Sequence, residues 1–436
     1  MRGERDPRKR KLSAGSVIML AMLAIVLAGS ALVLGRLSSG ASVDLSKLSM
    51  DVLNLQDKAA ESVPQESPGG NGSGGTAAAT EAPAATEAPA ENPPGKFTLT
   101  IGGSVAITGE VRKNSWSADS KVSDFSDMMM LLAPELRANV NIVFVENILS
   151  DDHKISDIVA PASAAGLLKE SGFDMAACGY GQAYAQGKDG VETTLMSLTE
   201  RHITPVGLRY ADASDNVELF SFGRVRTAVL QYTATIASKT RKAMEKEGTS
   251  GMVPEAETER ISREIEAARR QGAEAVIVLL NWGKNATNPD KKQRELAESI
   301  AMCGADLIVG NGSHTPQSAE YLAGAGGKEV LCVWSLGSLL CGDRSNIARL
   351  SGYLLHVTIR SDGQGGAEIL DPEYTPVYTW KYKQDSRFYY RCIVSDTDYP
   401  DGMDSEQQKY MTRSAETVAK ALQGSPVKRR GQADAD

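Results

Sequence analysis

The chain has 436 residues and a formal net charge of −8, with 42% hydrophobic and 23% charged side chains. This length is sufficient for one large folded domain with appended segments. The mild acidity argues against nucleic acid as a partner, because proteins that bind it concentrate Lys and Arg on one surface.

The first segment predicts a membrane anchor. Residues 1–11 are basic, with only Glu4 and Asp6 as acids, and residues 12–35 contain no charged side chain. A helix of that length spans a hydrocarbon core of about 30 Å. The alternative is a cleaved signal peptide, but its apolar core has only about 7–15 residues. We therefore expect a single-pass signal anchor in the cell membrane, with a cytoplasmic N-terminus and an extracellular main domain.

Two segments without a folded domain are expected next. Residues 36–64 form a predicted juxtamembrane stalk, with apolar side chains spaced by three and four at Leu45, Leu48, Val52, Leu55 and Ala59. This spacing suits a short amphipathic helix or the seam of a homodimer. We favour the helix, because the pattern covers barely two heptads. Residues 65–95 are rich in Gly, Ala, Pro, Thr and Glu and repeat the motif ATEAPA, which predicts a disordered linker.

From residue 96 onward, short apolar runs alternate with helical patterns, which indicates an α/β fold. Strands are expected at 97–101, 141–146, 226–232, 275–280, 306–309, 329–335 and 353–360, and helices at 124–137, 162–171, 189–200, 254–271, 288–303 and 405–422. The less helical part from 329 to 379 suggests antiparallel strands at one side. We divide the remainder into a main domain at 96–379, a C-terminal extension with a helix at 380–422, and a disordered tail at 423–436.

The stretch from 275 to 322 is expected to organise the main domain. It reads as strand, loop, helix, strand and loop, with Asn288 as the predicted helix cap and Gly304 as the helix end. Two parallel strands joined by a helix place both following loops at the same sheet edge. Those loops are Asn281-Trp282-Gly283 and Gly310-Asn311-Gly312-Ser313-His314. Open α/β folds keep their sites at that carboxyl edge.

The two loops resemble segments of the CapA family of poly-γ-glutamate capsule synthesis proteins, which typically show His-Trp-Gly in the first and Gly-His-His-Pro-His in the second. The resemblance covers roughly residues 97–376. It includes Gly172-Phe173-Asp174, Thr194-Leu195 and Ser335-Leu336-Gly337-Ser338-Leu339. The resemblance implies the four-layer α/β/β/α sandwich of the calcineurin-like metallophosphoesterases and a role in capsule assembly.

The positions that depart from the family pattern are those that would bind metal. The family's Asp after the first strand is Gly103 here, its Asn-His is Gly181-Gln182, and its first-loop His is Asn281. A two-metal centre needs several anionic or imidazole ligands, and side-chain amides bind transition metals weakly. We therefore expect no cofactor and lean toward a non-catalytic domain, with a divalent metal as the alternative.

Several polar residues remain candidates for a site. The catalytic candidates are His314, Asn281 and Gln182. The candidates for a ligand pocket are Glu146, Asn147, Trp282, Asn311 and Ser338. A remodelled metal site would use Glu146, Asp152, His153 and His314. Each has a structural alternative: the imidazole caps a turn, the indole packs in the domain wall, and residues 151–153 form a hydrated turn.

Three classes of function follow from these patterns. The first is a binding or assembly module for an anionic capsule or cell-wall polymer, or for subunits of an export complex. The second is a metal-dependent hydrolase with a remodelled site, and the third is a structural partner acting through the stalk. The sequence has no Gly-x-Ser-x-Gly elbow and no Cys-x-x-Cys pair, which argues against a serine hydrolase and a thioredoxin-like site. Its five cysteines would form one or two disulfides or serve as small core residues.

Overall fold

The computed structural model describes residues 95–431 except 114, 118–121, 124, 214–216, 285 and 385–386. The predicted cytoplasmic tail, membrane anchor at 12–35, stalk and nearly all of the linker lie outside the described residues. Within the described part, no helix has both the length and the apolar composition needed to cross a membrane. The anchor, the homodimer seam and the location of the chain therefore stay predictions.

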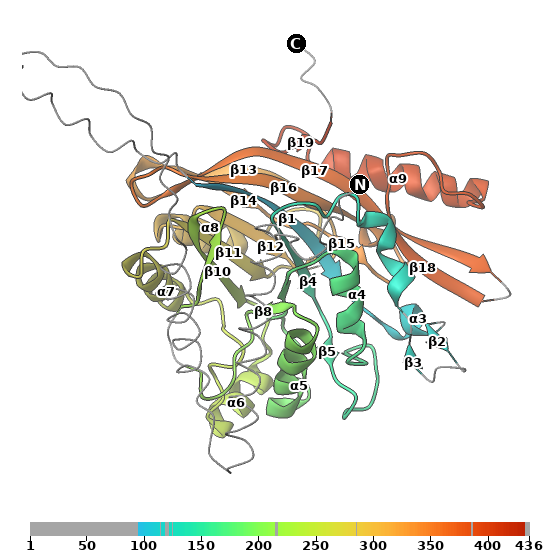
Figure 1. Cartoon of the computed structure of the whole chain (residues 1–436), viewed down its shortest axis with the longest axis horizontal. Helices are drawn as coiled ribbons and strands as arrows, with labels where there is room; N and C mark the ends of the chain where they lie inside the picture. Colours follow the sequence, from blue (N-terminus) through green and yellow to red (C-terminus); the bar gives the residue numbers. More distant parts are fainter. Residues whose placement is uncertain are drawn as a thin grey trace, which may run out of the picture. The chain divides into compact units, whose positions relative to one another are not determined.

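A nine-stranded mixed sheet, called the first sheet, forms one half of the core (Figure 1). Its main order is β18–β17–β16–β1–β4–β7–β8, with β15 beside β1 and β19 beside β17. The strands are β1 (Lys96–Val105), β4 (Val140–Val145), β7 (Met175–Ala177), β8 (Thr204–Val206), β15 (Ser338–Leu340), β16 (Ser351–Ser361), β17 (Ala367–Gln384), β18 (Arg387–Val394) and β19 (Lys428–Arg429). β1, β4, β7 and β8 are parallel, whereas β16, β17 and β18 are antiparallel. The expected antiparallel strands in 329–379 are thus confirmed for β16 and β17, whereas β15 pairs in parallel with β1, and residues 331–333 pair in parallel with residues 307–309.

A six-stranded sheet, called the second sheet, faces the first. Its order is β13–β14–β12–β11–β10–β9. The strands are β9 (Leu219–Phe222), β10 (Val225–Thr233), β11 (Ala275–Asn281), β12 (Leu307–Asn311), β13 (Ala319–Ala323) and β14 (Glu329–Val333). The four inner strands are parallel, and every residue of β11 is buried. Burial on both faces explains why this strand reads as a continuous apolar run.

Helices pack against both sheets. The helices are α3 (Gly109–Arg112), α4 (Ala164–Ser171), α5 (Gly187–Glu200), α6 (Ser238–Glu247), α7 (Thr258–Arg270), α8 (Lys291–Met302) and α9 (Ser405–Ala421). The 3₁₀ turns are η1 (Ser126–Met128), η2 (Met130–Leu132), η3 (Ala325–Gly327) and η4 (Ile347–Leu350). Two further two-stranded sheets pair β2 (Trp116–Ser117) with β3 (Val122–Ser123) and β5 (Ile148–Leu149) with β6 (Val159–Ala160).

Three apolar clusters define the layers. The cluster between the sheets includes Ile101, Ile142 and Leu279. A second cluster joins α4 and α5 to the outer face of the first sheet, and a third joins α7 and α8 to the second sheet. Full burial of each aliphatic side chain stabilises the folded state by about 1.5–3 kcal/mol relative to leaving it exposed. The layer order is therefore α/β/β/α, as the resemblance implied.

Some helix predictions were wrong in their position or type. Residues 124–137 were predicted as one helix, but the described residues form the turns η1 and η2, separated by the non-helical Met129 at φ = −130°. Pro134 follows and lacks the N–H that a continuing helix requires. The helix expected from Asn288 is capped instead by Asp290, whose carboxylate accepts a hydrogen bond from the Gln293 backbone N–H at 3.0 Å. The helix expected from Pro254 begins at Thr258. The capping box of Asp290 thus fixes the start of α8, whereas α7 begins without a side-chain cap.

The predicted C-terminal boundaries also need correction. The boundary at residue 380 falls inside β17, so the extension belongs to the same sheet as the main domain. The tail predicted to be disordered from 423 contains β19, and the structure describes it to residue 431. Val427 is buried in the cluster between the sheets, and Arg429 and Arg430 pair with Asp396 and Glu135. These contacts hold a segment whose polar composition alone suggested disorder.

Candidate functional site

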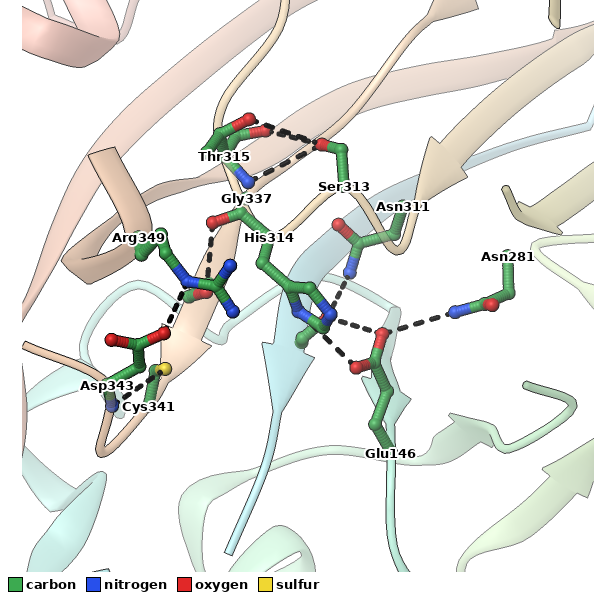
Figure 2. A network of polar contacts seen from close by, with 12 residues as sticks. Glu146, Asn281, Asn311, Ser313, His314, Thr315, Gly337, Cys341, Asp343 and Arg349 are labelled. Carbon is green, nitrogen blue, oxygen red and sulfur yellow. Dashed lines mark hydrogen bonds and ion pairs between the residues drawn. The ribbon is translucent and has the colours of Figure 1, made fainter. Parts of the chain in front are cut away.

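Polar side chains from both sheets meet at the carboxyl ends of their parallel strands (Figure 2). Ser104 lies at the end of β1 and Glu146 directly follows β4, both in the first sheet. Asn281 and Asn311 are the last residues of β11 and β12, in the second sheet. The site therefore lies where the two sheets share an edge, as the strand–loop pattern predicted.

Glu146 is the centre of this cluster. Its side chain is 10% exposed, and one carboxylate oxygen accepts hydrogen bonds from Ser104 Oγ at 2.8 Å and Asn281 Nδ2 at 3.1 Å. The other oxygen lies 3.4 Å from His314 Nδ1. The amide oxygen of Asn281 accepts from Thr235 Oγ1 at 3.1 Å. Hydrogen bonds of this kind offset the cost of burying a carboxylate.

Asn311 extends the network into the second sheet. Its Nδ2 donates to Ser104 Oγ at 2.8 Å, and its Oδ1 accepts from Ser335 Oγ at 3.3 Å. Ser335 Oγ in turn accepts from Ser313 Oγ at 2.8 Å. All four side chains are buried. A buried network whose members satisfy one another fixes a single arrangement of the loops.

His314 is the half-exposed member of the site. Its backbone has φ = 54°, an uncommon conformation for a residue other than glycine. Backbone strain of this kind costs about 1–3 kcal/mol and concentrates at functional sites. The nearby Asp343 has its pKa lowered by hydrogen bonds from Ser345 and by the charges of Arg349 and His314. Glu146 is thus the carboxylate in direct contact with the imidazole.

Tyr180 adds a second unusual group near Glu146. It follows β7, directly before Gly181-Gln182, and the residue is 7% exposed. Its hydroxyl has no hydrogen-bond partner among the described residues. Burial and the charge of Glu146 raise the pKa of this phenol, so the hydroxyl stays protonated and is available as a donor.

The structure separates the candidate residues into two groups. Glu146, Asn281, Asn311 and His314 come together, and Ser338 Oγ contacts the His314 carbonyl oxygen at 3.4 Å. Gln182 is exposed in the loop after β7. Ser104, Tyr180, Thr235 and Ser335 were not among the predicted site residues, because serine, threonine and tyrosine are common on any loop.

Two residues predicted for the ligand pocket instead stabilise the fold. Asn147 is 1% exposed, and its side-chain oxygen accepts from the Ile107 backbone N–H at 2.7 Å. Trp282 is also 1% exposed, stacks on Trp334 at 5.5 Å between ring centroids, and donates to its carbonyl oxygen at 3.0 Å. Neither side chain can contact a ligand from solvent.

Asp152 and His153 form a turn after β5 rather than joining Glu146. The Asp152 backbone N–H donates to Ser150 Oγ at 3.1 Å, and His153 Nδ1 lies 2.9 Å from the same hydroxyl. Across the described ranges, no group of three or more His, Cys, Asp or Glu side chains is arranged to hold a metal ion. The four residues proposed for a remodelled metal site are therefore not brought together.

The chemistry of the donors does not fit a two-metal centre. Glu146 and His314 are its only direct pair of anionic and imidazole groups, and the remaining members of the network are amides and hydroxyls already bonded to one another. A Cβ atom on Gly103 would lie 2.3 Å from the Gly337 carbonyl oxygen. One on Gly181 would lie 2.5 Å from Thr235 Oγ1. Neighbouring atoms thus fill the space that metal-binding side chains would need at these positions.

The five cysteines are all free thiols. Cys178 follows β7 beside the site, but it is fully buried and burial raises the pKa of its thiol to about 12. Its Sγ donates to the Val206 carbonyl oxygen at 3.3 Å. Because the thiolate is the nucleophilic form, this cysteine is a core residue rather than a catalytic group.

The sandwich and its polar edge define an α/β protein with a candidate site built jointly by two facing sheets. The family described as "Bacterial capsule synthesis protein PGA_cap" matches residues 98–343. This match covers more than half of the sequence, and the chain belongs to that family.

Individual relatives agree with this assignment. The chain is 26% identical over 239 residues to the "PGA biosynthesis protein CapA" of Bacillus subtilis (strain 168), covering 53% of this chain and 60% of that protein. It is 26% identical over 176 residues to the "Capsule biosynthesis protein CapA" of Bacillus anthracis, covering 40% of this chain and 41% of that protein. The matched part thus spans less than two thirds of either relative.

Two solved structures are also similar to this chain. The NAD nucleotidase NadN of Haemophilus influenzae has a TM-score of 0.41 at 11% identity, covering 74% of this chain and 60% of that one. The calcineurin-like phosphoesterase YfkN from Bacillus subtilis has a TM-score of 0.38 at 9% identity, covering 76% of this chain and 100% of that one.

Proposed function

We propose that this chain is a membrane-anchored, extracytoplasmic member of the capsule synthesis family that assembles or exports an anionic envelope polymer without hydrolysing it. The observation that carries the proposal is the closed network around Glu146. One oxygen of its carboxylate accepts from both Ser104 and Asn281, and the other faces His314. The family's ligand positions at Gly103 and Gly181 have no room for side chains. Such a site keeps the loops in place but lacks the charge that two divalent cations require.

The β17–β18 hairpin offers a surface suited to a polymer of carboxylates. We define the hairpin surface as residues 381–384 and 387–391, which carry four Lys or Arg side chains. Lys381 contacts Glu110 at 4.0 Å and Arg391 contacts Asp127 at 3.1 Å, whereas Lys383 and Arg387 have no ion pair with the described residues. The chain as a whole has a net charge of −8, so this local concentration of cations stands out. A polyanion would be attracted here in preference to the acidic remainder of the surface.

Aromatic rings hold these cations in place. Lys381 Nζ lies 4.5 Å from the centre of the Phe388 ring, and the Arg391 guanidinium lies 5.0 Å from the Tyr382 ring. Tyr382 stacks on Tyr389 at 5.5 Å. Cation–π contacts of this kind contribute about 0.5–1 kcal/mol at exposed sites. The ordered rings reduce the side-chain entropy that the cations would lose on binding.

A binding measurement on the full chain in detergent tests the proposal. We expect poly-γ-glutamate to bind with an affinity that falls as salt is added, because the contacts are between exposed charges. Replacing Lys383 and Arg387 together by Glu should abolish the binding. Replacing Lys291 and Lys292 on α8 by Glu makes the same change of charge elsewhere and should preserve most of it. Absence of binding by the unmodified chain, or equal loss in both variants, would contradict the proposed role of this surface.

The second candidate function is a metal-dependent hydrolase with a remodelled site. The contact between His314 and Glu146 and the strained backbone at His314 favour it. Elemental analysis of the purified full chain distinguishes the two functions. Near-stoichiometric Mn, Fe or Zn that is lost in a His314→Ala variant would support the hydrolase. The same result would contradict the proposal that the chain assembles a polymer without hydrolysing it.

A further inference from the structure

A cavity of about 500 Å³ lies against the first sheet, beside the amino-terminal half of β1. The candidate site described above is at the carboxyl end of the same strand, so the two are distinct. The cavity is lined by strands β1, β16 and β17, by the segment at 135–138, and by Arg430, which follows β19. Its volume is within the range of about 300–1,000 Å³ that is usual for small-molecule sites.

The floor of this cavity is polar and rigid. His356 is 8% exposed and lies between two threonines, with Nδ1 3.0 Å from Thr100 Oγ1 and Nε2 3.1 Å from Thr375 Oγ1. Burial, together with the charges of Arg430 and Arg429, lowers the pKa of His356 to about 3. The imidazole is therefore neutral near pH 7 and adds no charge to the floor.

One wall of the cavity is a β-bulge. In the pairing of β16 with β17, His356 lies opposite Glu373 but Thr358 lies opposite Leu370, so β17 contains an extra residue at this point. Asp371 lies in the bulge with φ = 48°. Bulges redirect side chains and occur often beside functional sites, and a strained non-glycine residue costs about 1–3 kcal/mol. This strain places an exposed carboxylate on the wall.

The charges on the walls are only partly paired. Arg430 contacts Glu135 at 3.1 Å and Glu373 at 3.9 Å. The side chains of Arg137 and Asp371 line the same cavity, and neither has an ion pair or side-chain hydrogen bond with the described residues. One free cation and one free anion thus border a space with a neutral hydrogen-bonded floor.

We propose that this cavity binds a small zwitterion, namely a free α-amino acid. The carboxylate of the ligand would pair with the Arg137 guanidinium, whose fork of N–H donors matches two carboxylate oxygens. The ammonium group would pair with Asp371. The remaining volume leaves room for a side chain. This proposal is independent of polymer binding by the hairpin surface, which is formed by other residues.

Titration of the full chain with three small probes tests the idea. Glycine carries both charges, acetate only the negative one and methylammonium only the positive one. We expect calorimetry or ligand-observed NMR to detect glycine binding, with acetate and methylammonium each bound about ten-fold or more weakly, because each forms only one of the two charged contacts. No detectable glycine binding at millimolar concentration, or equal binding of glycine and acetate, would overturn the proposal.

Variants then locate the site. Arg137→Gln and Asp371→Asn should each weaken glycine binding about ten-fold or more. Both side chains are exposed, and Asn tolerates a positive φ, so both variants should keep the melting temperature of the unmodified chain. Arg263→Gln removes an exposed, unpaired cation on α7 and should leave glycine binding unchanged. Unchanged binding in the first two variants would place the amino acid elsewhere and refute this site.

Discussion

Replacing Gly103 by Ala tests whether the candidate site is closed. The added Cβ would lie 2.3 Å from the Gly337 carbonyl oxygen and 3.0 Å from its carbonyl carbon. That oxygen also accepts the Ser104 backbone N–H at 3.0 Å, so β15 cannot move away without weakening this bond. Overpacking lowers the free energy of unfolding by about 1–3 kcal/mol, and weakening the hydrogen bond lowers it by about 1 kcal/mol. Alanine also restricts the unfolded chain more than glycine does, which raises the free energy of unfolding by about 0.4–1 kcal/mol. The net loss should be about 2 kcal/mol.

Urea unfolding of the full chain, followed by tryptophan fluorescence, measures this loss. Gly251→Ala is the matched control, because no atom lies within 4 Å of its added Cβ and its backbone is not left-handed. We expect the control to unfold at the same urea concentration as the unmodified chain or slightly above it. A Gly103→Ala chain with unchanged stability would refute the reasoning, since the space beside β1 would then accept a larger side chain.

Three further predictions concern other parts of the molecule. Asp306→Ala removes a buried carboxylate that accepts from the Val276 N–H and pairs with Arg269 and Lys328, and calorimetry should show a loss of about 3–5 kcal/mol. The pKa of His356 falls from 6.5 to about 3 on folding, so the unfolded chain gains a proton first as the pH drops below 6.5. Stability should therefore decline toward pH 3 by at most about 1.4 kcal/mol per pH unit, with a shallower decline in His356→Gln. Ellman's reagent should modify one thiol rapidly, Cys303, because the other four are buried.

The parallel core strands were predictable because their environment is uniform. β11 is buried along its whole length, so its composition alone marks it. β17 was missed as a single strand because it crosses several environments, from the exposed bulge at Asp371 to the buried Tyr378 and the half-exposed hairpin. α6 was also missed, since Met244 is its only buried residue and no apolar stripe is visible.

The location of the candidate site followed from topology, but its composition did not. A helix between two parallel strands places Asn281 and Asn311 at one edge, and this part was correct. The partners of these amides are far away in sequence, since Ser104 belongs to β1 and Thr235 lies in the loop after β10. No local pattern distinguishes them from other hydroxyl residues. Trp282 shows the converse, because a residue typical of ligand sites is buried against Trp334.

The position of β1 in the first sheet has a consequence for how the protein is made. β1 is an inner strand, flanked by β4 on one side and by β16 on the other, where Phe97 pairs with Ile359. A ribosome must therefore complete most of the chain before the opening strand finds its second neighbour. Until then the backbone N–H and C=O groups along one edge of β1 are unpaired. Synthesis interrupted between these strands should therefore yield aggregation-prone fragments that depend on chaperones.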